Sequence, residues 1–513
     1  MIHRIEARAA GRSPSGRPII RYAGALPAAA LGMLLLWAPW PFASVTPWAW
    51  ALLATGICAA FALALVTAPP GAFRPVAVPA AALLGLALLG LAKSLPWPQP
   101  VAEAVSPGHA RLAREAAVAL EPGARAPEPG AVALSVAPGE SRRSAAAFAV
   151  LAAALAAAAA AGRVREGRRL VGAAVLAAAL GQVLYGAPRW LAGAETVWGV
   201  AVGAGQRLQG TFVNPNHFAL YLEMALALAF AWGWWAWGRA ARDGGPPERR
   251  VALVAVPALA WLTLFAALAF TGSRAGLAAA LVGVVAQGAL LALRRGRGRR
   301  GLGWAVAGAL AGAVVAAAGL AVVAFAGFEA GLGRLAGTSP YQVAWNERID
   351  VYRATWELWR EFPWLGTGLG TFLHAFPLVQ RPAPDELLWR HAHSDPLELL
   401  AVAGGLGGAL LLVGLAAVLL RLLRLLRRGR RREDRAAALA GLGALVAVGL
   451  HELADFGLTM PANALTLAAL VGAAMAAPYR DGATEGGVAG RTSTGPGHTR
   501  PPAAEARVSS SRR

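Results

Sequence analysis

Long apolar runs recur along the whole chain and restrict its fold more than any other feature does. About twelve of them are close to 20 residues long, the length of helix that crosses the roughly 30 Å hydrocarbon core of a bilayer. They lie near residues 24–43, 46–68, 75–95, 144–161, 170–187, 214–237, 251–270, 274–293, 302–327, 396–420, 436–456 and 460–477. Hydrophobic residues make up 57% of the 513 positions and charged residues 15%. This composition excludes a soluble multidomain enzyme and predicts an all-α, polytopic membrane protein with about twelve transmembrane helices.

The placement of arginine predicts the topology. The formal net charge is +21, and the arginines gather in the amino-terminal tail and in alternate short loops, at residues 1–21, 163–169, 239–250, 294–300 and 421–435. Arginine-rich short loops stay in the cytoplasm, so this charge reflects topology and not nucleic-acid binding. We expect both termini in the cytoplasm. Residues 1–20 form a tail, 21–477 the transmembrane body, and 478–513 a disordered tail rich in Gly, Pro, Ser and Arg.

Two long loops are expected on the opposite, outer side of the membrane. Residues 96–143 are rich in Pro, Ala, Gly and Glu and lack strong periodicity, which predicts a partly ordered loop. Residues 328–395 contain an amphipathic helix that Pro363 ends. Its stripe at helical spacing consists of Trp345, Ile349, Tyr352, Trp356 and Trp359. Such a helix either lies on the membrane surface or packs this face against other spans.

Polar groups near the outer ends of the runs are the candidates for chemistry. Asn214 and Asn216 directly precede a span, where they cap the following helix or bind a ligand through their amides. Arg274 lies at the hydrocarbon boundary, where a charge is costly unless it snorkels, pairs with a carboxylate or binds an anion. Arg348 on the amphipathic helix presents a fork that matches two phosphate oxygens, or else pairs within its helix.

Histidines and acids form two further candidate groups. His391 and His393 precede Asp395 at the start of a span. Three interpretations are open: a metal pair with no third strong ligand nearby, an imidazole that takes a proton from a sugar hydroxyl while Asp395 orients it, or a plain helix-entry motif. His451 and Asp455 are one helical turn apart and share a face, as a structural or a catalytic pair.

The order and spacing of these groups resemble the bacterial O-antigen ligase and polymerase superfamily. The matching segments are residues 210–216, the pair Ser273-Arg274, Arg348 followed by 361–372, and 391–394 followed by 404–407. The resemblance covers about 200–480, and the amino-terminal third matches only as a hydropathy profile. The family often has asparagine after the histidine, where this chain has Ser394, and this departure affects hydrogen bonding on the acceptor side.

The resemblance implies a polytopic glycosyltransferase with a GT-C-like helical fold and a helical periplasmic loop, in the bacterial inner membrane. Such enzymes move a glycan from undecaprenyl pyrophosphate to an acceptor hydroxyl on the periplasmic face, without a nucleotide sugar, a metal or another cofactor. Carried onto this chain, Arg274 and Arg348 hold the pyrophosphate and His393 assists the acceptor hydroxyl. The supporting residues are Asn214, Asn216, His391, Asp395, His451 and Asp455.

Other functions remain as alternatives. A ligase and a repeat-unit polymerase share these motifs and differ in the acceptor, which is a lipid-anchored core sugar for one and a second lipid-linked glycan for the other; we favour the ligase. A polysaccharide transporter or flippase predicts inverted repeats and ionisable residues near the bilayer midplane. A structural subunit of an envelope complex is a further alternative, and it would not require arginine and histidine side chains to lie close together. The discriminating observation is whether Arg274, Arg348 and His393 line one outward-facing cavity.

Overall fold

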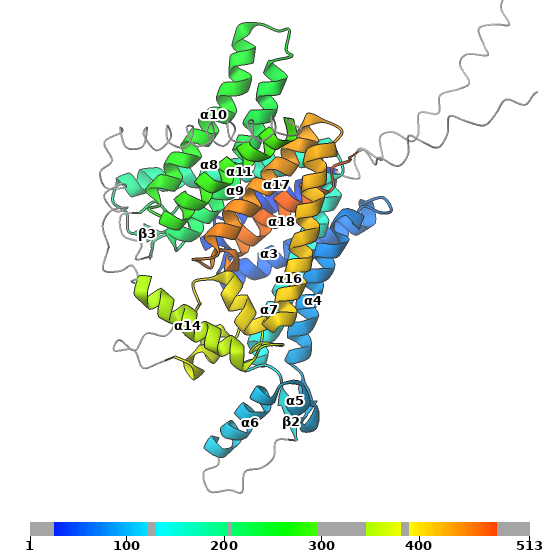
Figure 1. The fold of residues 1–513 in the computed structure, drawn as a ribbon. Coiled ribbons are helices and arrows are strands. Elements are labelled where there is room, and N and C mark those ends of the chain that lie inside the picture. Colours follow the sequence, from blue (N-terminus) through cyan, green and yellow to red (C-terminus); the bar gives the residue numbers. More distant parts are fainter. Residues whose placement is uncertain (1–24, 121–129, 203–206, 296–344, 381–388, 480–513) are drawn as a thin grey trace, which may run out of the picture. The chain divides into compact units, whose positions relative to one another are not determined.

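Helices built from the apolar runs make up most of the structure. The computed structural model describes residues 25–120, 130–202, 207–295, 345–380 and 389–479 (Figure 1). Within them, nine helices are long and apolar enough to cross a membrane. These are α3 (Pro47–Thr67), α4 (Ala77–Lys93, extended by η3 at Arg74–Val76), α7 (Pro138–Gly162), α8 (Arg165–Leu191), α9 (Pro215–Ala240), α10 (Pro247–Phe270), α11 (Arg274–Arg295), α16 (Asp395–Arg428) and α17 (Arg432–His451). The predicted all-α, multi-pass membrane fold is confirmed.

Two shorter apolar helices, α2 (Ala25–Trp37) and α18 (Pro461–Met475), occupy two more of the predicted runs. The run at 302–327, the predicted tail 1–20 and residues 480–513 of the predicted tail 478–513 lie outside the described residues. The smaller elements are η2 (Phe42–Ser44), β1 (Pro96–Pro98), α5 (Gln99–Val105), α6 (Pro107–Leu120), β2 (Ala131–Ala133), β3 (Thr196–Val197), β4 (Val200–Ala201), α14 (Trp345–Glu361), α15 (Phe372–Ala375), η4 (Phe376–Leu378) and η5 (Gly457–Thr459). The strands pair only as β1 with β2 and β3 with β4, both antiparallel.

Helix α9 occupies the centre of the core. It packs against α10, α11 and α17, and its first four turns are almost entirely buried (Figure 1). Small residues let the neighbouring backbones approach closely, as where Gly283 faces Ala447. The buried Gln287 amide of α11 donates to the carbonyl oxygens of Ala227 (2.9 Å) and Leu439 (3.1 Å), which joins α11 to α9 and α17. Polar groups at one end of α9 are therefore held by a tightly packed frame.

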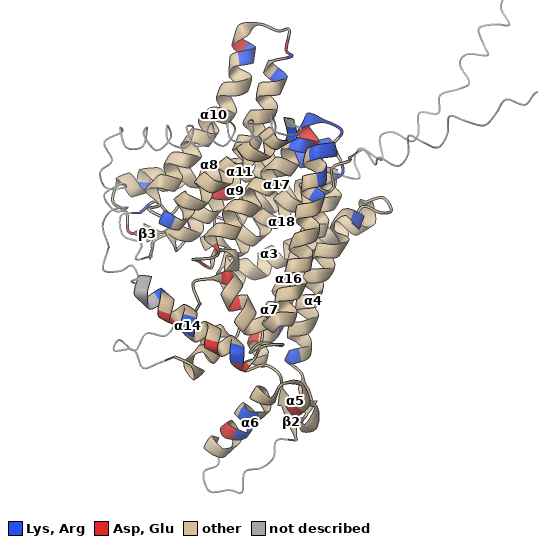
Figure 2. Cartoon of the chain, in the orientation of Figure 1, with Lys and Arg blue, Asp and Glu red and all other residues tan. Residues whose placement is uncertain are grey.

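Arginine tracts from different loops meet at one end of the bundle. Arg168 donates to Asp434 at 2.6 Å and the pair is buried, while Arg165 and Arg169 both contact Glu433. Figure 2 shows the arginines gathered around the turn between α16 and α17. The tracts at 163–169 and 421–435 thus lie together, as the alternation of basic loops requires. Which side of the membrane this end faces stays a prediction.

The described part of the segment 96–143 contains regular structure. It forms the β1–β2 ribbon, in which Trp97 is opposite Val132, and the helices α5 and α6. Proline at the first turn of each helix favours its start, and the 14-residue helix α6 is amphipathic, with its apolar residues at helical spacing. Arg111 of α6 forms an ion pair with Glu361, the last residue of α14. The segment therefore supports the end of α14.

The amphipathic helix α14 ends at Glu361, before Pro363, as predicted. It packs against α16 through Val351, Thr355 and Leu358, all of which are buried. The tryptophan stripe lies beside this face, so that Trp356 remains 48% exposed. Packing against the protein therefore uses mainly the aliphatic side of the helix, and Ile349, Tyr352 and Trp359 of the stripe are half-buried beside it.

Helix α16 is broken at Gly404, where φ is +67°. Residues 363–368 wrap around this break: the Thr367 amide donates to Ala401 (3.0 Å), and the Gly405 amide donates back to Pro363 (2.8 Å). A Cβ at Gly404 would lie 2.3 Å from the Trp364 carbonyl oxygen, so only glycine fits there. The two segments that carried the family resemblance, 361–372 and 404–407, are thus one structural unit.

Candidate functional site

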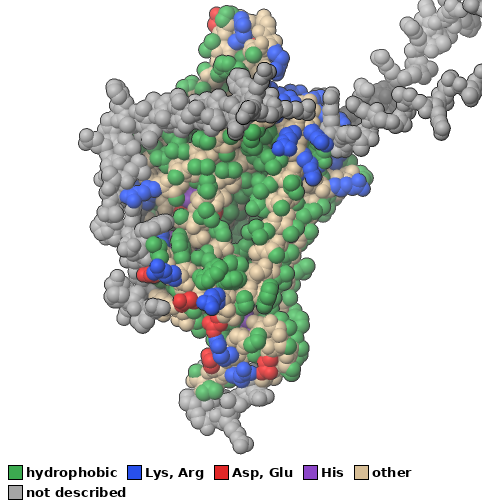
Figure 3. Space-filling view, viewed as in Figure 1, with side chains coloured by type: hydrophobic (Ala, Val, Ile, Leu, Met, Phe, Trp, Pro, Cys, Tyr) green, Lys and Arg blue, Asp and Glu red, His purple; other side chains and the backbone are tan. Residues whose placement is uncertain are grey.

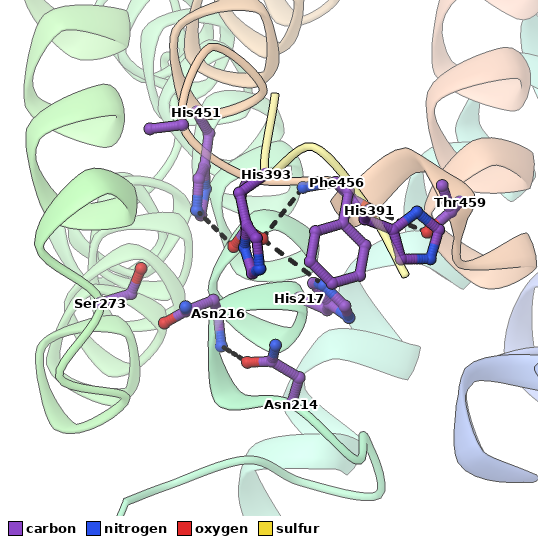
Figure 4. Close-up of polar contacts among 12 residues, drawn as sticks. Asn214, Asn216, His217, Ser273, His391, His393, His451, Phe456 and Thr459 are labelled. Carbon is purple, nitrogen blue, oxygen red and sulfur yellow. Dashed lines mark hydrogen bonds and ion pairs between the residues drawn. The ribbon is translucent and has the colours of Figure 1, made fainter. Parts of the chain in front are cut away.

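The candidate site lies where α9 begins, α17 ends and the loop before α16 passes between them (Figure 4). His217 is in the first turn of α9, and His451 is the last residue of α17. His391 and His393 lie in the loop that leads into α16. Asp455 follows α17. Segments more than 200 residues apart in sequence therefore contribute to one cluster.

A buried chain of ion pairs runs through the site. Asp455 Oδ1 lies 3.6 Å from His217 Nε2, and Asp455 Oδ2 lies 3.5 Å from His451 Nε2. On its other side, His451 Nδ1 lies 2.6 Å from Glu223 Oε1. Burial opposes ionisation of Asp455, yet the imidazoles of His217 and His451 hold its pKa well below the usual range. Asp455 is therefore a fixed negative charge, and the predicted proximity of His451 and Asp455 is confirmed.

The ring of His393 is enclosed by aromatic side chains. It meets Phe456 edge to face at a centroid distance of 5.0 Å and Trp389 at 5.7 Å. Its buried Nδ1 has no hydrogen-bond partner in the part of the chain that the structure describes. Burial and, after it, the charge of Arg348 lower the pKa of His393 to about 4. At neutral pH the ring is thus uncharged and able to accept a proton.

The backbone around His393 is held in an unusual conformation. His393 has φ +53°, in the left-handed region that only a few per cent of residues other than glycine adopt. Its carbonyl oxygen accepts a hydrogen bond of 2.9 Å from the Tyr352 hydroxyl of α14. The loop is also fixed by His391, whose Nδ1 lies 3.2 Å from Glu398, and by the Ala392 amide, which donates to the same carboxylate at 2.8 Å. Although burial opposes it, Glu398 raises the pKa of His391.

Arg348 reaches the same cluster from α14. Its Nη1 donates to the carbonyl oxygen of Ala454 at 3.2 Å, next to Asp455. Its Nε is buried and has no hydrogen-bond partner among the described residues. Because an arginine carries five N–H donors, the side chain keeps donors for a further acceptor. The structure therefore brings together Arg348, His391, His393, His451 and Asp455.

The starts of two helices lie beside this cluster. Asn214 and Asn216 are at the start of α9, and Arg274 is at the start of α11. Asn214 Oδ1 accepts from the Asn216 amide at 2.9 Å, which confirms the predicted cap of α9. Arg207 donates to Asn216 (2.6 Å) and to the Thr271 carbonyl (2.6 Å), joining α9 to the turn before α11. Arg274 follows Ser273, is exposed, and is the first residue of α11.

Glu223 connects these helix starts to the histidine cluster. A Cβ at Gly276 would lie 2.9 Å from Glu223 Oε1 and 3.0 Å from Ser273 Oγ, so the carboxylate sits directly against the first turn of α11. The same oxygen contacts His451. One buried carboxylate therefore touches both the helix that begins with Arg274 and the imidazole that holds Asp455.

Asp395 is positioned differently from our expectation that it orients a histidine. Its backbone amide donates to the carbonyl oxygens of Glu452 (3.0 Å) and Asp455 (3.1 Å). Burial and the adjacent Asp395 carboxyl raise the pKa of Glu452 to about 11, so that Glu452 is protonated. Asp455 is the carboxylate with the largest effect on the pKa of His393. Asp395 thus fixes the start of α16 against the loop after α17.

Sequence reasoning missed His217, Glu223, Arg207 and Glu398. Glu223 had a usable signal, because it is the only acid in the apolar run 214–237 and an ionisable group inside a span marks a functional or structural site. His217 ends the segment 210–217, directly after the asparagines. Within the described ranges, no group of three or more His, Cys, Asp or Glu residues is arranged to hold a metal ion.

Comparison with known proteins agrees with the motifs. Residues 258–412 match the model of a family described as O-antigen ligase. No curated protein matches the chain. The matched segment contains Arg274, Arg348 and His393, whereas Glu223, His451 and Asp455 lie outside it. The match at residues 258–412 supports the resemblance of the chain to the O-antigen ligase superfamily.

Proposed function

We propose that the protein is a membrane glycosyltransferase that moves a glycan from undecaprenyl pyrophosphate to an acceptor hydroxyl, on the periplasmic face of the bacterial inner membrane. The observation that supports this most is the cluster of uncharged His393, cationic Arg348 and ionised Asp455 at the ends of membrane-spanning helices. It combines a proton acceptor with a fixed cation. Glycan transfer from a diphosphate needs both.

The arginines act on the donor in this proposal. Negative charge develops on the pyrophosphate as its bond to the anomeric carbon breaks, and preorganised cations stabilise that charge. Arg348 has a buried Nε with no partner among the described residues, so it can turn part of its fork toward a phosphate. Arg274, at the start of α11, is the second cation. Neutralisation of the leaving group is thus assigned to protein side chains.

His393 acts on the acceptor. As the acceptor oxygen attacks the anomeric carbon, its proton passes to the imidazole of His393, and the pyrophosphate leaves with the electron pair of the broken C–O bond. Attack from the face opposite the leaving group inverts the anomeric centre. The imidazolium that forms lies near ionised Asp455, which stabilises it electrostatically.

The pH dependence of transfer is expected to reflect the lowered pKa of His393. Because this pKa is about 4, the ring is uncharged over the whole range above pH 5, and activity is lost only as the pH falls through about 4. An ordinary histidine would lose half of its activity already near pH 6.5. Initial rates in proteoliposomes between pH 4 and 8 test this. An acid limb centred near pH 6.5 would contradict the assigned environment.

Glu223→Gln is expected to lower the turnover number by about 10-fold, since a charged hydrogen bond to His451 becomes a neutral one and Asp455 loses part of its support. The donor KM should change less than the turnover number. Glu248→Gln, at an exposed position near the start of α10, is the control. Equal rates for both variants would show that the buried chain of ion pairs serves folding only.

Reconstitution of the full chain tests the proposed function directly. Proteoliposomes receive a polyprenyl-pyrophosphate-linked oligosaccharide together with either a lipid-anchored core saccharide or a second lipid-linked glycan. We expect covalent transfer to the core saccharide, with an inverted anomeric centre by NMR. Chain extension of the lipid-linked glycan instead would identify a polymerase. Movement of the glycan across the bilayer without a new glycosidic bond would identify a transporter and refute the proposal.

A further inference from the structure

A groove of about 470 Å³ lies between α14 and the first turn of α16. The groove is shallow and open to the surroundings along most of its length. Figure 3 shows acidic and basic side chains together on the surface over α14, next to a bundle surface that is mainly hydrophobic. The groove is lined by Ile349, Tyr352, Arg353, Trp356, Glu357, Arg360 and Leu397.

The lining combines an aromatic surface with charged hydrogen-bonding groups. Trp356 is 48% exposed, and its ring packs against Trp359 at a centroid distance of 4.6 Å, which limits its motion. A sugar ring presents C–H groups that pack on such an aromatic face and hydroxyls that pair with charged side chains. Arg353 and Arg360 offer hydrogen-bond donors to such hydroxyls, and Glu357 offers an acceptor.

The groove is preformed, because the opposite side of α14 is fixed in the protein. Val351 and Leu358 are buried, and the helix packs against α16. An ion pair between Arg353 and Asp350 (3.3 Å) involves two highly exposed side chains, so it contributes little and does not close the groove. A ligand therefore meets a rigid surface and loses little entropy in ordering it.

One end of the groove is continuous with the candidate site. Tyr352 lines the groove, and its hydroxyl donates to the carbonyl oxygen of His393 at 2.9 Å. Leu397 lies only four residues after His393. Arg348 precedes Tyr352 by one turn of the same helix, and its guanidinium contacts Ala454. Through Tyr352, the groove therefore adjoins the loop that carries His393.

We propose that this groove binds the saccharide of the glycan acceptor. The inference rests on the proposed function, in which His393 takes the proton of the acceptor hydroxyl. The substrate that must place a hydroxyl at His393 is the acceptor, and the groove lies against the loop that carries that residue. Trp356 and the two groove arginines then recognise the sugars next to the reacting one.

Trp356→Ala in the full-length, reconstituted protein is expected to raise the KM for the acceptor by about 10-fold. The turnover number and the donor KM should stay within about 2-fold, because the side chain touches neither the donor nor the reacting atoms. Trp356→Tyr, which restores an aromatic face, should recover most of the affinity. The matched control is Trp364→Ala, which removes a 75% exposed tryptophan outside the groove.

An unchanged acceptor KM in Trp356→Ala would overturn the proposal. A parallel rise in the KM values of donor and acceptor would also overturn it, since that result indicates a helix that merely anchors in lipid headgroups. A direct binding measurement distinguishes failure of the groove proposal from failure of the proposed function. In it, tryptophan fluorescence reports binding of the isolated acceptor saccharide in the absence of donor. One outcome would refute the proposed function but keep the groove as a saccharide site: the wild type binds the saccharide but transfers no glycan, and Trp356→Ala abolishes the binding.

Discussion

Replacement of His393 is expected to reduce glycan transfer by about 10²- to 10⁴-fold, the usual contribution of general base catalysis. The ring is uncharged at neutral pH and its Nδ1 has no partner among the described residues, so it is free to accept the acceptor proton. His393→Asn is the sharper variant, because asparagine tolerates the left-handed backbone that His393 adopts. His393→Ala should show the same loss. Initial rates in proteoliposomes measure it.

Two controls separate chemistry from folding in that experiment. Membrane insertion and thermal stability of His393→Asn should equal those of the wild type, since the backbone strain and the Tyr352 hydrogen bond to residue 393 are retained. His374→Ala removes an exposed histidine of α15 and should leave transfer unchanged. Full transfer by His393→Asn would remove the proton acceptor from the mechanism and leave the cluster with a structural role.

Much of the fold could be predicted from the sequence, because spanning helices are governed by hydrophobic length. The runs near 46–68, 214–237 and 396–420 each became a helix of sufficient length. The order within 96–143 could not be predicted in the same way, since α5 and α6 are too short to span a membrane and α6 is held by the ion pair of Arg111 with Glu361 of the distant α14. Long-range packing, and not local preference, made the difference.

The site was predicted in part, for a related reason. Residues close in sequence, such as His391 and His393, or His451 and Asp455, are visible as patterns. The contact between Glu223 and His451 joins residues separated by 228 positions, and no single-sequence pattern encodes such a pair. The choice of Asp455 over Asp395 as the acid near His393 also depends on the loop after α17, whose path is set by tertiary contacts.

Lys93 shows how a tertiary requirement can decide a residue type. It is the only lysine in a chain otherwise rich in arginine. Its ammonium is buried at the end of α4 and donates to the carbonyl oxygens of Leu365, Gly366 (3.0 Å) and Val402 (3.2 Å). A compact cation with three donors suits three converging carbonyl groups, whereas a planar guanidinium does not. The single lysine is visible in the sequence, but the reason for it is structural: the carbonyl groups that it binds lie at the break in α16.

Arg348→Lys is expected to weaken use of the donor by about 10- to 150-fold, measured as kcat/KM for the polyprenyl-linked glycan. The change keeps the positive charge but removes the planar fork, and a hydrogen bond to a charged group contributes about 1.5–3 kcal/mol. Arg143→Lys, at a highly exposed position near the start of α7, is the control for arginine loss in general.

A double-mutant cycle with Arg274→Lys decides whether both arginines hold the same pyrophosphate. If they share one ligand, the loss in the double variant differs from the sum of the single losses in free energy, because the remaining contact depends on how the other arginine orients the phosphates. Strictly additive losses would place the two residues on separate ligands or assign Arg274 to the membrane interface. Since Glu223 touches the first turn of α11 and also His451, adding Glu223→Gln to each single variant shows whether the two arginines depend on the buried ion-pair chain.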